Sequence, residues 1–182
     1  LNHVAYIIPM ARHFMGNIKP NKIRRSHQQL TDQTIYDLRL WIKFLQSARR
    51  GISLNILTIR QPTRIAFSDA CPWGMGGYLL SGQAWRFQIP KHSILRGDNR
   101  YNNLFEFLGM IVNVWLECEF SMAPDMECIL ALGDNTSAIG WLHNTSKLYD
   151  SEHGQEAHWL AAQHLASITL KAGACLASQH IK

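Results

Sequence analysis

Apolar and polar residues alternate with periods that change along the chain, and these changes outline its secondary structure. Residues 31–50 carry apolar side chains at helical spacing, which predicts a helix with Thr31 at its start. Its predicted inward-facing stripe is Ile35, Leu38, Trp41, Ile42 and Leu45. From residue 64 onward, short apolar runs separated by Gly and Pro predict strands, and longer periodic stretches predict helices. The predicted strands are 64–69, 76–80, 84–89, 128–132 and 174–181, and the predicted helices are 102–119, 136–143 and 155–170.

The charge balance divides the chain near Pro62. Residues 1–65 hold eleven Lys or Arg against two acids, a net charge of +9, whereas residues 66–182 hold seven against eleven, a net charge of −4. We therefore expect a mainly helical basic segment over residues 1–62 and a second domain over residues 63–182. Within the first segment we expect a helix in residues 1–15, started or broken at Pro9, and a short strand over residues 54–59.

A run of cations without acids lies between the first two predicted helices. It contains Lys19, Lys22, Arg24 and Arg25. These side chains are candidates for contacts to nucleic-acid phosphates, and a solvated surface loop is an equally good interpretation.

Composition and length set the class of protein. An apolar share of 47% and a charged share of 17% in 182 residues are typical of a globular chain. No apolar run approaches the length of a membrane span, and the start lacks the layout of a signal peptide. The four cysteines form no Cys-x-x-Cys pair, which favours reduced thiols and an intracellular location, with cytoplasm and nucleus both open. Because the first residue is Leu, we expect the chain to begin inside a longer one.

Three acids lie at the ends or starts of predicted elements. Asp69 ends the first strand, Glu106 lies in the first turn of a helix, and Asp134 follows the next buried strand. Asp69 is two residues beyond Phe67, so period two places it on the same face, which we expect to face the core. Taken singly, each acid has an ordinary interpretation: a turn cap, a helix-dipole acid and a helix N-cap, respectively.

Taken together, the three acids predict a metal site. The carboxyl ends of neighbouring strands in an α/β sheet line one crevice, where Asp69 and Asp134 meet and Glu106 reaches over from the helix. Clustered carboxylates repel one another unless cations lie between them. Oxygen-only ligation favours Mg²⁺ or Mn²⁺, and two such ions are suited to phosphodiester cleavage.

Three phrases of the sequence carry a family resemblance. Phe-Ser-Asp-Ala-x-x-x-Gly-x-Gly-Gly-Tyr-Leu, Asn-Asn-Leu-Phe-Glu-Phe-Leu-Gly and Ala-Leu-Gly-Asp-Asn-Thr-Ser-Ala resemble the first three acidic motifs of the RNase H domain in retroelement reverse transcriptases. The opening, Leu-Asn-His-Val-Ala-Tyr-Ile-Ile-Pro-Met-Ala-Arg-His-Phe, looks like the stretch after the polymerase palm in gypsy-like and DIRS-like retrotransposons. Together these phrases span nearly the whole chain.

The resemblance implies a fold, an activity and partners. The implied fold is an α/β, RNase H-like mixed sheet, with a three-stranded antiparallel hairpin unit plus parallel strands flanked by helices. The implied activity is Mg²⁺-dependent (or Mn²⁺-dependent) cleavage of RNA in an RNA–DNA hybrid, with Asp69, Glu106 and Asp134 as metal ligands and catalytic residues. A polymerase domain is implied upstream in the same polyprotein, and no membrane partner is implied.

The sequence departs from the family pattern at its end. The family has a fourth acid just beyond the last strand, in an Ala-Asp-x-Leu-Ser-Arg-like phrase, and residues 178–182 stop short of it. We therefore expect a C-terminally truncated domain with weak metal binding and slow cleavage or none. Two alternatives stay open: a non-catalytic RNase H-like or connection module that binds nucleic acid, and a decayed retroelement fragment.

Overall fold

The structure is a computed structural model that describes residues 4, 8–15, 18, 29–58, 60–143 and 155–181. Its strands are β1 (Arg64–Cys71), β2 (Gly74–Leu79), β3 (Ala84–Gln88), β4 (Cys128–Gly133) and β5 (Cys175–His180). Its α-helices are α2 (Asp32–Ala48), α3 (Asn102–Phe120), α4 (Thr136–His143) and α5 (Gln155–Ala172). Its 3-10 helices are η1 (Pro9–Phe14), η2 (Leu54–Leu57), η3 (Asn99–Tyr101) and η4 (Pro124–Met126). From β1 onward the order of strands and α-helices is the predicted one.

One mixed sheet organises the second part of the chain. Its five strands lie in the order β3-β2-β1-β4-β5. The pairs β1–β2 and β2–β3 are antiparallel, whereas β1–β4 and β4–β5 are parallel. The predicted fold class, an antiparallel three-stranded unit extended by parallel strands and flanked by helices, is therefore confirmed.

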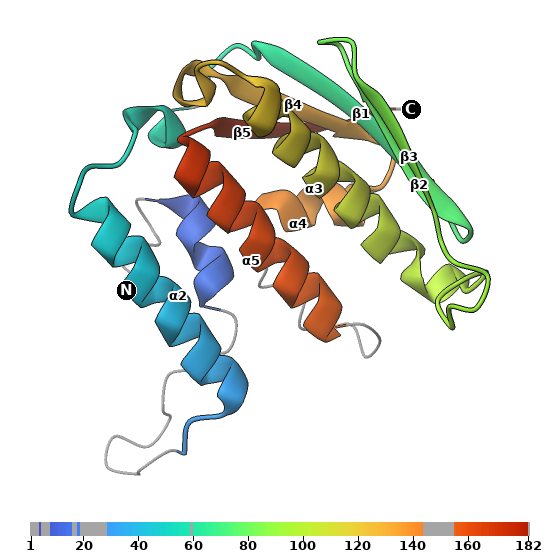
Figure 1. Cartoon of the computed structure of the whole chain (residues 1–182), viewed down its shortest axis with the longest axis horizontal. Helices are drawn as coiled ribbons and strands as arrows, with labels where there is room; N and C mark the ends of the chain where they lie inside the picture. The colour runs from blue at the N-terminus through green and yellow to red at the C-terminus, as the bar shows by residue number, and fades with distance from the viewer. Residues whose placement is uncertain are drawn as a thin grey trace.

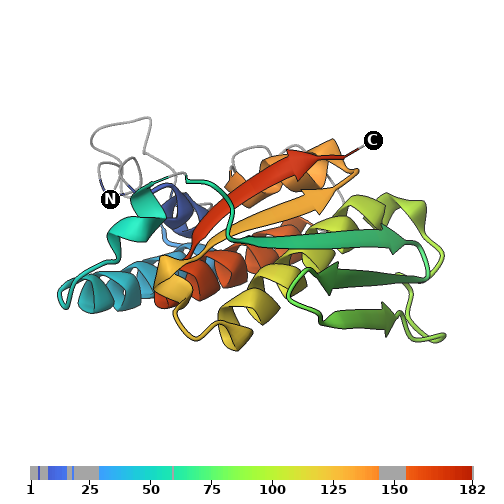
Figure 2. The same ribbon diagram turned by 90° about the horizontal axis from the view of Figure 1, so that it is seen from above.

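The helices α3, α4 and α5 lie on one side of this sheet (Figure 1), and Figure 2 looks onto the other side. Helix α3 packs along β1, and α5 packs against α3. The core between these layers is apolar, because every second strand residue and one face of each helix turn toward it. Its buried side chains include Ala66, Phe107, Met110, Val114, Ile129, Ala131, Leu142 and Leu165.

Before Pro62, η1 and α2 contact α5, whereas η2 contacts β5 and η4. Phe14 and Trp41 belong to the same apolar cluster as the core of the sheet and helices. The buried His13 donates from Nε2 to the carbonyl oxygen of Leu142, and its burial lowers the pKa of the imidazole to about 4, so the ring is neutral at pH 7. The division of the chain at residue 62 stays a prediction.

Several local predictions are wrong. Residues 54–57 form the 3-10 helix η2 in place of a strand, because Ser53 caps them and the Asn55 amide donates to the carbonyl oxygens of Glu127 and Gly173. In α2 the inward side chains are Trp41 and Phe44, while Ile42 and Leu45 are 55% and 40% exposed.

For α3 the sequence predicts Asn102 or Asn103 as the N-cap, and the structure differs. Its N-cap is Tyr101, without a side-chain hydrogen bond, because the preceding 3-10 turn η3 feeds directly into the helix. The cap that precedes both is Asp98, whose carboxylate accepts from the Arg100 N–H. The helical spacing of Trp115 with Leu104, Leu108 and Ile111 predicts that its side chain faces inward, but it is 44% exposed. The apolar face predicted from helical periodicity is therefore wider than the face of α3 that is buried.

The four predicted phosphate-binding residues, Lys19, Lys22, Arg24 and Arg25, lie outside the described residues. Among the described helices, none has the length and apolar character needed to cross a membrane.

Candidate metal centre

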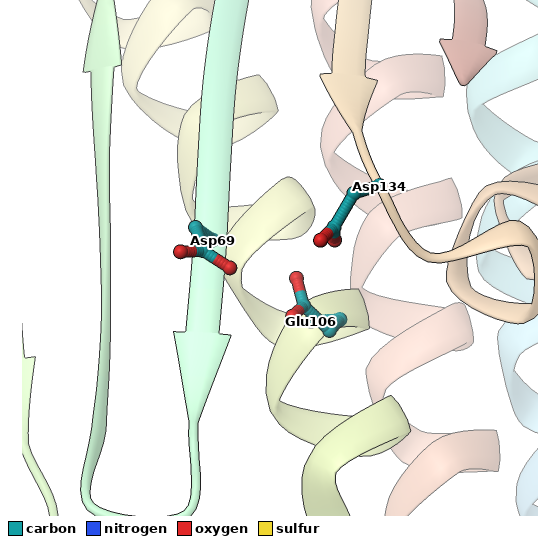
Figure 3. A group of neighbouring side chains, drawn as sticks. All are labelled: Asp69, Glu106 and Asp134. Carbon is teal, nitrogen blue, oxygen red and sulfur yellow. The ribbon is translucent and has the colours of Figure 1, made fainter. Parts of the chain in front are cut away.

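Three carboxylates meet at one edge of the sheet. Asp69 lies near the end of β1, Asp134 directly follows β4, and Glu106 lies in the second turn of α3. Since β1 and β4 are parallel neighbours, their carboxyl ends share an edge, and α3 begins beside that edge. Figure 3 shows the three side chains turned toward a common point. One oxygen from each lies within 4.8 Å of the others, so the predicted convergence is confirmed.

Glu106 is the buried member of this group. Its side chain is 3% exposed, whereas Asp69 and Asp134 are exposed. Its Oε1 accepts the backbone N–H of Ala70 at 3.1 Å. Burial raises the pKa of Glu106 to about 7; the Ala70 hydrogen bond opposes this, and the charges of Asp134 and Asp69 add to it. Within the described part of the chain, no cationic side chain forms an ion pair with any of the three acids.

The face of β1 that carries Asp69 is a correction to the sequence prediction. Ala66 and Ser68 are buried and face α3, whereas Phe67 and Asp69 alternate onto the opposite face, where Phe67 stacks on Tyr78. Asp69 therefore does not lie in a core-facing stripe, and its carboxylate stays hydrated. The buried acid is instead Glu106, which reaches the site from α3, and its carboxylate loses the favourable hydration that Asp69 keeps.

Close approach of α3 to the sheet brings Glu106 to the strand ends. A Cβ atom added at Gly109 would lie 3.2 Å from the Ser68 Cβ, tighter than an ordinary contact. At Gly133 an added Cβ would lie 2.5 Å from the Met110 Cε. These two glycines let the helix backbone and its Met side chain sit against β1 and β4. A bulkier residue at Gly109 would require Ser68 and α3 to move apart by a few tenths of an ångström, whereas one at Gly133 would require the flexible end of Met110 to shift.

Asn135 takes the capping role that one interpretation of the sequence gave to Asp134. Its Oδ1 accepts the backbone N–H groups of Ser137 and Ala138 at the start of α4. Its Nδ2 donates to the Asn103 Oδ1 at 2.7 Å, which ties the turn after β4 to the start of α3. The Asp134 carboxylate is thereby left for the acidic cluster. Sequence reasoning assigned neither of these roles of Asn103 and Asn135, although both residues lie within the quoted acidic motifs.

The backbone that carries Asp134 is also held from the last strand. The His180 Nε2 donates to the Asp134 carbonyl oxygen at 2.9 Å, and the Ile181 N–H donates to the Gly133 carbonyl oxygen at 3.0 Å. The turn after β4 is thus fixed from β5 as well as from α3.

The residues present fit a hard divalent cation. All three groups offer oxygen ligands, and oxygen is what Mg²⁺ and Mn²⁺ prefer. Burial is the main cause of the raised pKa at Glu106, and the charges of Asp134 and Asp69 add to it, as expected for close carboxylates that no cation separates. The same set of donors does not suit zinc, which prefers sulfur and nitrogen.

No protein-family profile and no curated protein matches the chain. Among solved structures, the chain is similar to RNase H1 from the halophilic archaeon Halobacterium salinarum NRC-1, with 15% sequence identity and a TM-score of 0.43. The match covers 65% of this chain and 84% of that one. A match at this level does not by itself indicate a substrate or an activity.

Proposed function

We propose that the chain is an RNase H-type nuclease module that hydrolyses the RNA strand of RNA–DNA hybrids with Mg²⁺ or Mn²⁺. We further propose that it belongs to a retroelement reverse transcriptase, with a polymerase domain upstream, as the sequence motifs suggest. The observation that supports the nuclease best is the group formed by Asp69, Glu106 and Asp134: three acids from three elements within 4.8 Å, one of them buried, with no cation paired to them in the described residues.

Such a cluster is unfavourable for the fold alone. Repulsion among the three carboxylates and the burial of Glu106 both destabilise the charged state. Sites that retain unfavourable charge are frequently functional, because bound ligands compensate the charge. Two divalent cations held there would activate a water molecule and stabilise the leaving oxygen of a phosphodiester.

The chain's own residues have distinct parts in this proposal. Asp69 and Asp134 are exposed, so they present ligand oxygens toward a bound strand, while Glu106 closes the site from the helix side. The Ala70 N–H holds the Glu106 carboxylate in place. The pKa of Glu106 is about 7, so this side chain is protonated in a fraction of the molecules at neutral pH. Cation binding releases the proton from that fraction.

The test is hybrid cleavage under single-turnover conditions with Mg²⁺ and, separately, Mn²⁺. We expect slow cleavage of the RNA strand by the native chain, with a rate that falls by about a hundredfold or more in Asp69→Asn, because charge is lost while shape is kept. Asp125→Asn is the matched control: Asp125 is an exposed acid in η4, outside the cluster, and its loss should leave the rate unchanged.

Thermal unfolding of the same proteins gives a readout that is independent of cleavage. Mg²⁺ should raise the melting temperature of the native chain and of Asp125→Asn, but not that of Asp69→Asn. Cleavage that persists in folded Asp69→Asn would remove the catalytic assignment. A folded native chain that binds hybrids without cutting them would support a non-catalytic binding module instead.

A further inference from the structure

The strand register places a cation directly across the sheet from Asp69. Asp69 pairs with Gly76 of β2, and Gly76 pairs in turn with Arg86 of β3. Residues directly opposite each other on neighbouring strands point to the same face, so Asp69 and Arg86 share the face that the helices leave uncovered. Figure 2 looks onto this face, and in Figure 3 the neighbouring strand β2 runs beside Asp69. Gly76 places no side chain between them.

The same pattern repeats one step further along the hairpin. Cys71 pairs with Gly74, and Gly74 pairs with Gln88, again with no side chain on the middle strand. A Cβ atom added at Gly74 would lie 2.5 Å from the Phe87 carbonyl oxygen, so this position cannot carry a larger residue without a shift of β3. At Gly74 and Gly76, strand β2 therefore presents bare backbone between side chains on β1 and β3.

A cavity of about 690 Å³ is lined by these two glycines and by side chains of β1 and β3. Its lining includes Asp69, Cys71, Trp73, Arg86 and Gln88, so it extends from one acid of the cluster, Asp69, to Arg86. Trp73, in the turn between β1 and β2, is 54% exposed. The cavity thus combines an acid from the candidate metal centre, a guanidinium and an exposed indole.

The Arg86 side chain is available to an anion. It is exposed, and no hydrogen bond or ion pair within the described residues occupies its guanidinium. Two strand spacings of about 4.8 Å separate its backbone from that of Asp69, and the two side chains form no ion pair with each other. A guanidinium matches the geometry of a phosphate, and an exposed aromatic ring in the lining of the same cavity suits a base or sugar.

We propose that this cavity is a subsite for one nucleotide of the strand that is cut, close to the scissile phosphate. Arg86 binds a backbone phosphate of that nucleotide, and Trp73 packs against its base or sugar. This proposal rests on the proposed function, because it takes the scissile phosphate to lie at the acidic cluster. It adds contacts that set where the strand lies across β1, β2 and β3.

The experiment measures binding apart from cleavage. Fluorescence anisotropy of a labelled RNA–DNA hybrid, with EDTA present, gives the Kd at several salt concentrations for Arg86→Gln, Arg86→Lys and Trp73→Ala in the full chain. Arg86→Gln should weaken binding by about tenfold and lower the salt slope by about one. Compared with Arg86→Gln, Arg86→Lys should recover part of the affinity and the whole salt slope. Lysine keeps the positive charge but lacks the planar guanidinium that binds a phosphate through two N–H groups. Trp73→Ala should weaken binding by about fivefold with the slope unchanged.

Lys171→Gln is the matched control, since it removes one positive charge from an exposed residue near the end of α5, away from the cavity. It should change the Kd by less than about twofold. If Arg86→Gln and Lys171→Gln change the Kd equally, Arg86 contributes only nonspecific electrostatic attraction, and the proposed subsite is wrong. An unchanged Kd in Arg86→Gln, or no hybrid binding by the native chain, would overturn it as well.

Cleavage assays separate this proposal from the one on which it rests. If the native chain cuts hybrids and Arg86→Gln binds and cuts as well as the native chain, the nuclease stands and the subsite fails. If Arg86→Gln weakens binding as expected while no variant cuts, the subsite stands as a nucleic-acid contact and the proposed hydrolysis fails.

Discussion

Helix α3 carries a buried glutamate at each end of its contact with β1, and the two glutamates have opposite surroundings. Glu106 is 3% exposed and meets two further acids at the carboxyl end of the strand. Glu117 is 1% exposed and lies 4.0 Å from the Arg64 Nε at the start of the strand. Arg64 also contacts Glu127 at 3.2 Å. One end of the interface is thus an unpaired acidic cluster and the other an ion-paired one.

The two clusters differ in how far groups of the protein itself balance the negative charge. Burial raises the pKa of both glutamates, but the Arg64 charge and a hydrogen bond from Ser81 counteract that rise at Glu117. At Glu106 the neighbouring charges add to the rise, and the one opposing contact is the Ala70 N–H. The Arg64 cluster therefore compensates its own charge in part, whereas the Glu106 cluster needs an external cation to do so.

The largest effect on stability should come from removing the positive charge of Arg64, which pairs with Glu117 and Glu127. Arg64→Gln leaves Glu117 buried beside Glu127 without a positive charge, and we expect the free energy of unfolding at pH 7 to fall by about 3 kcal/mol. Urea unfolding followed by circular dichroism measures this. Arg39→Gln, an exposed arginine on α2, should change stability by less than about 0.5 kcal/mol. A loss no greater than that of the control would mean that Arg64 does not compensate Glu117.

A change of opposite sign is expected at the unpaired cluster. Without divalent cations, Glu106→Gln should stabilise the fold by about 2 kcal/mol at pH 8 and have little effect near pH 4. The folded pKa of about 7 lies above the usual value of 4.5, so the unfolded chain loses its proton first and the native protein loses stability as pH rises from 4.5 to 7. Urea unfolding across this pH range measures the difference, and destabilisation at pH 8 would contradict the unpaired arrangement.

The smallest effect should come from the outer acid of the paired cluster. Burial tends to raise the pKa of Glu127, but hydrogen bonds from Thr63 and Arg64 and the Arg64 charge bring it below its usual value. Glu127→Gln should therefore cost about 1 kcal/mol at pH 7, and the difference should disappear as pH falls through the lowered pKa. Thermal unfolding at pH 7 and pH 3 tests this, and a difference that stays constant with pH would assign the effect to packing.

Much of the fold and of the acidic cluster could be predicted from local pattern. Asp69 and Asp134 each follow an apolar run, and the carboxyl ends of parallel neighbours share an edge, so their meeting follows from the order of the elements. The identity of the motif around Glu106 indicated the third member. Element order is a property of local periodicity and turn residues, which the sequence states directly.

Other features were decided by packing between distant segments. The strand alternation at Asp69 was read correctly, but the sequence could not say which face the helices would cover, and they cover the face of Ala66 and Ser68. Ile42 and Trp115 have helical spacing suited to a core and are nevertheless exposed, because a helix packs through a stripe narrower than all its apolar residues.

Sequence by itself thus determined the order of the strands and α-helices from β1 onward and identified the three acids. The tertiary structure alone decided that Glu106, of the three acids, is the buried one, that Asn135 caps α4 in place of Asp134, and that Arg86 lies across Gly76 from Asp69. The physical reason is that burial, capping partners and strand register depend on contacts between residues far apart in the chain. Local periodicity carries no information about those contacts.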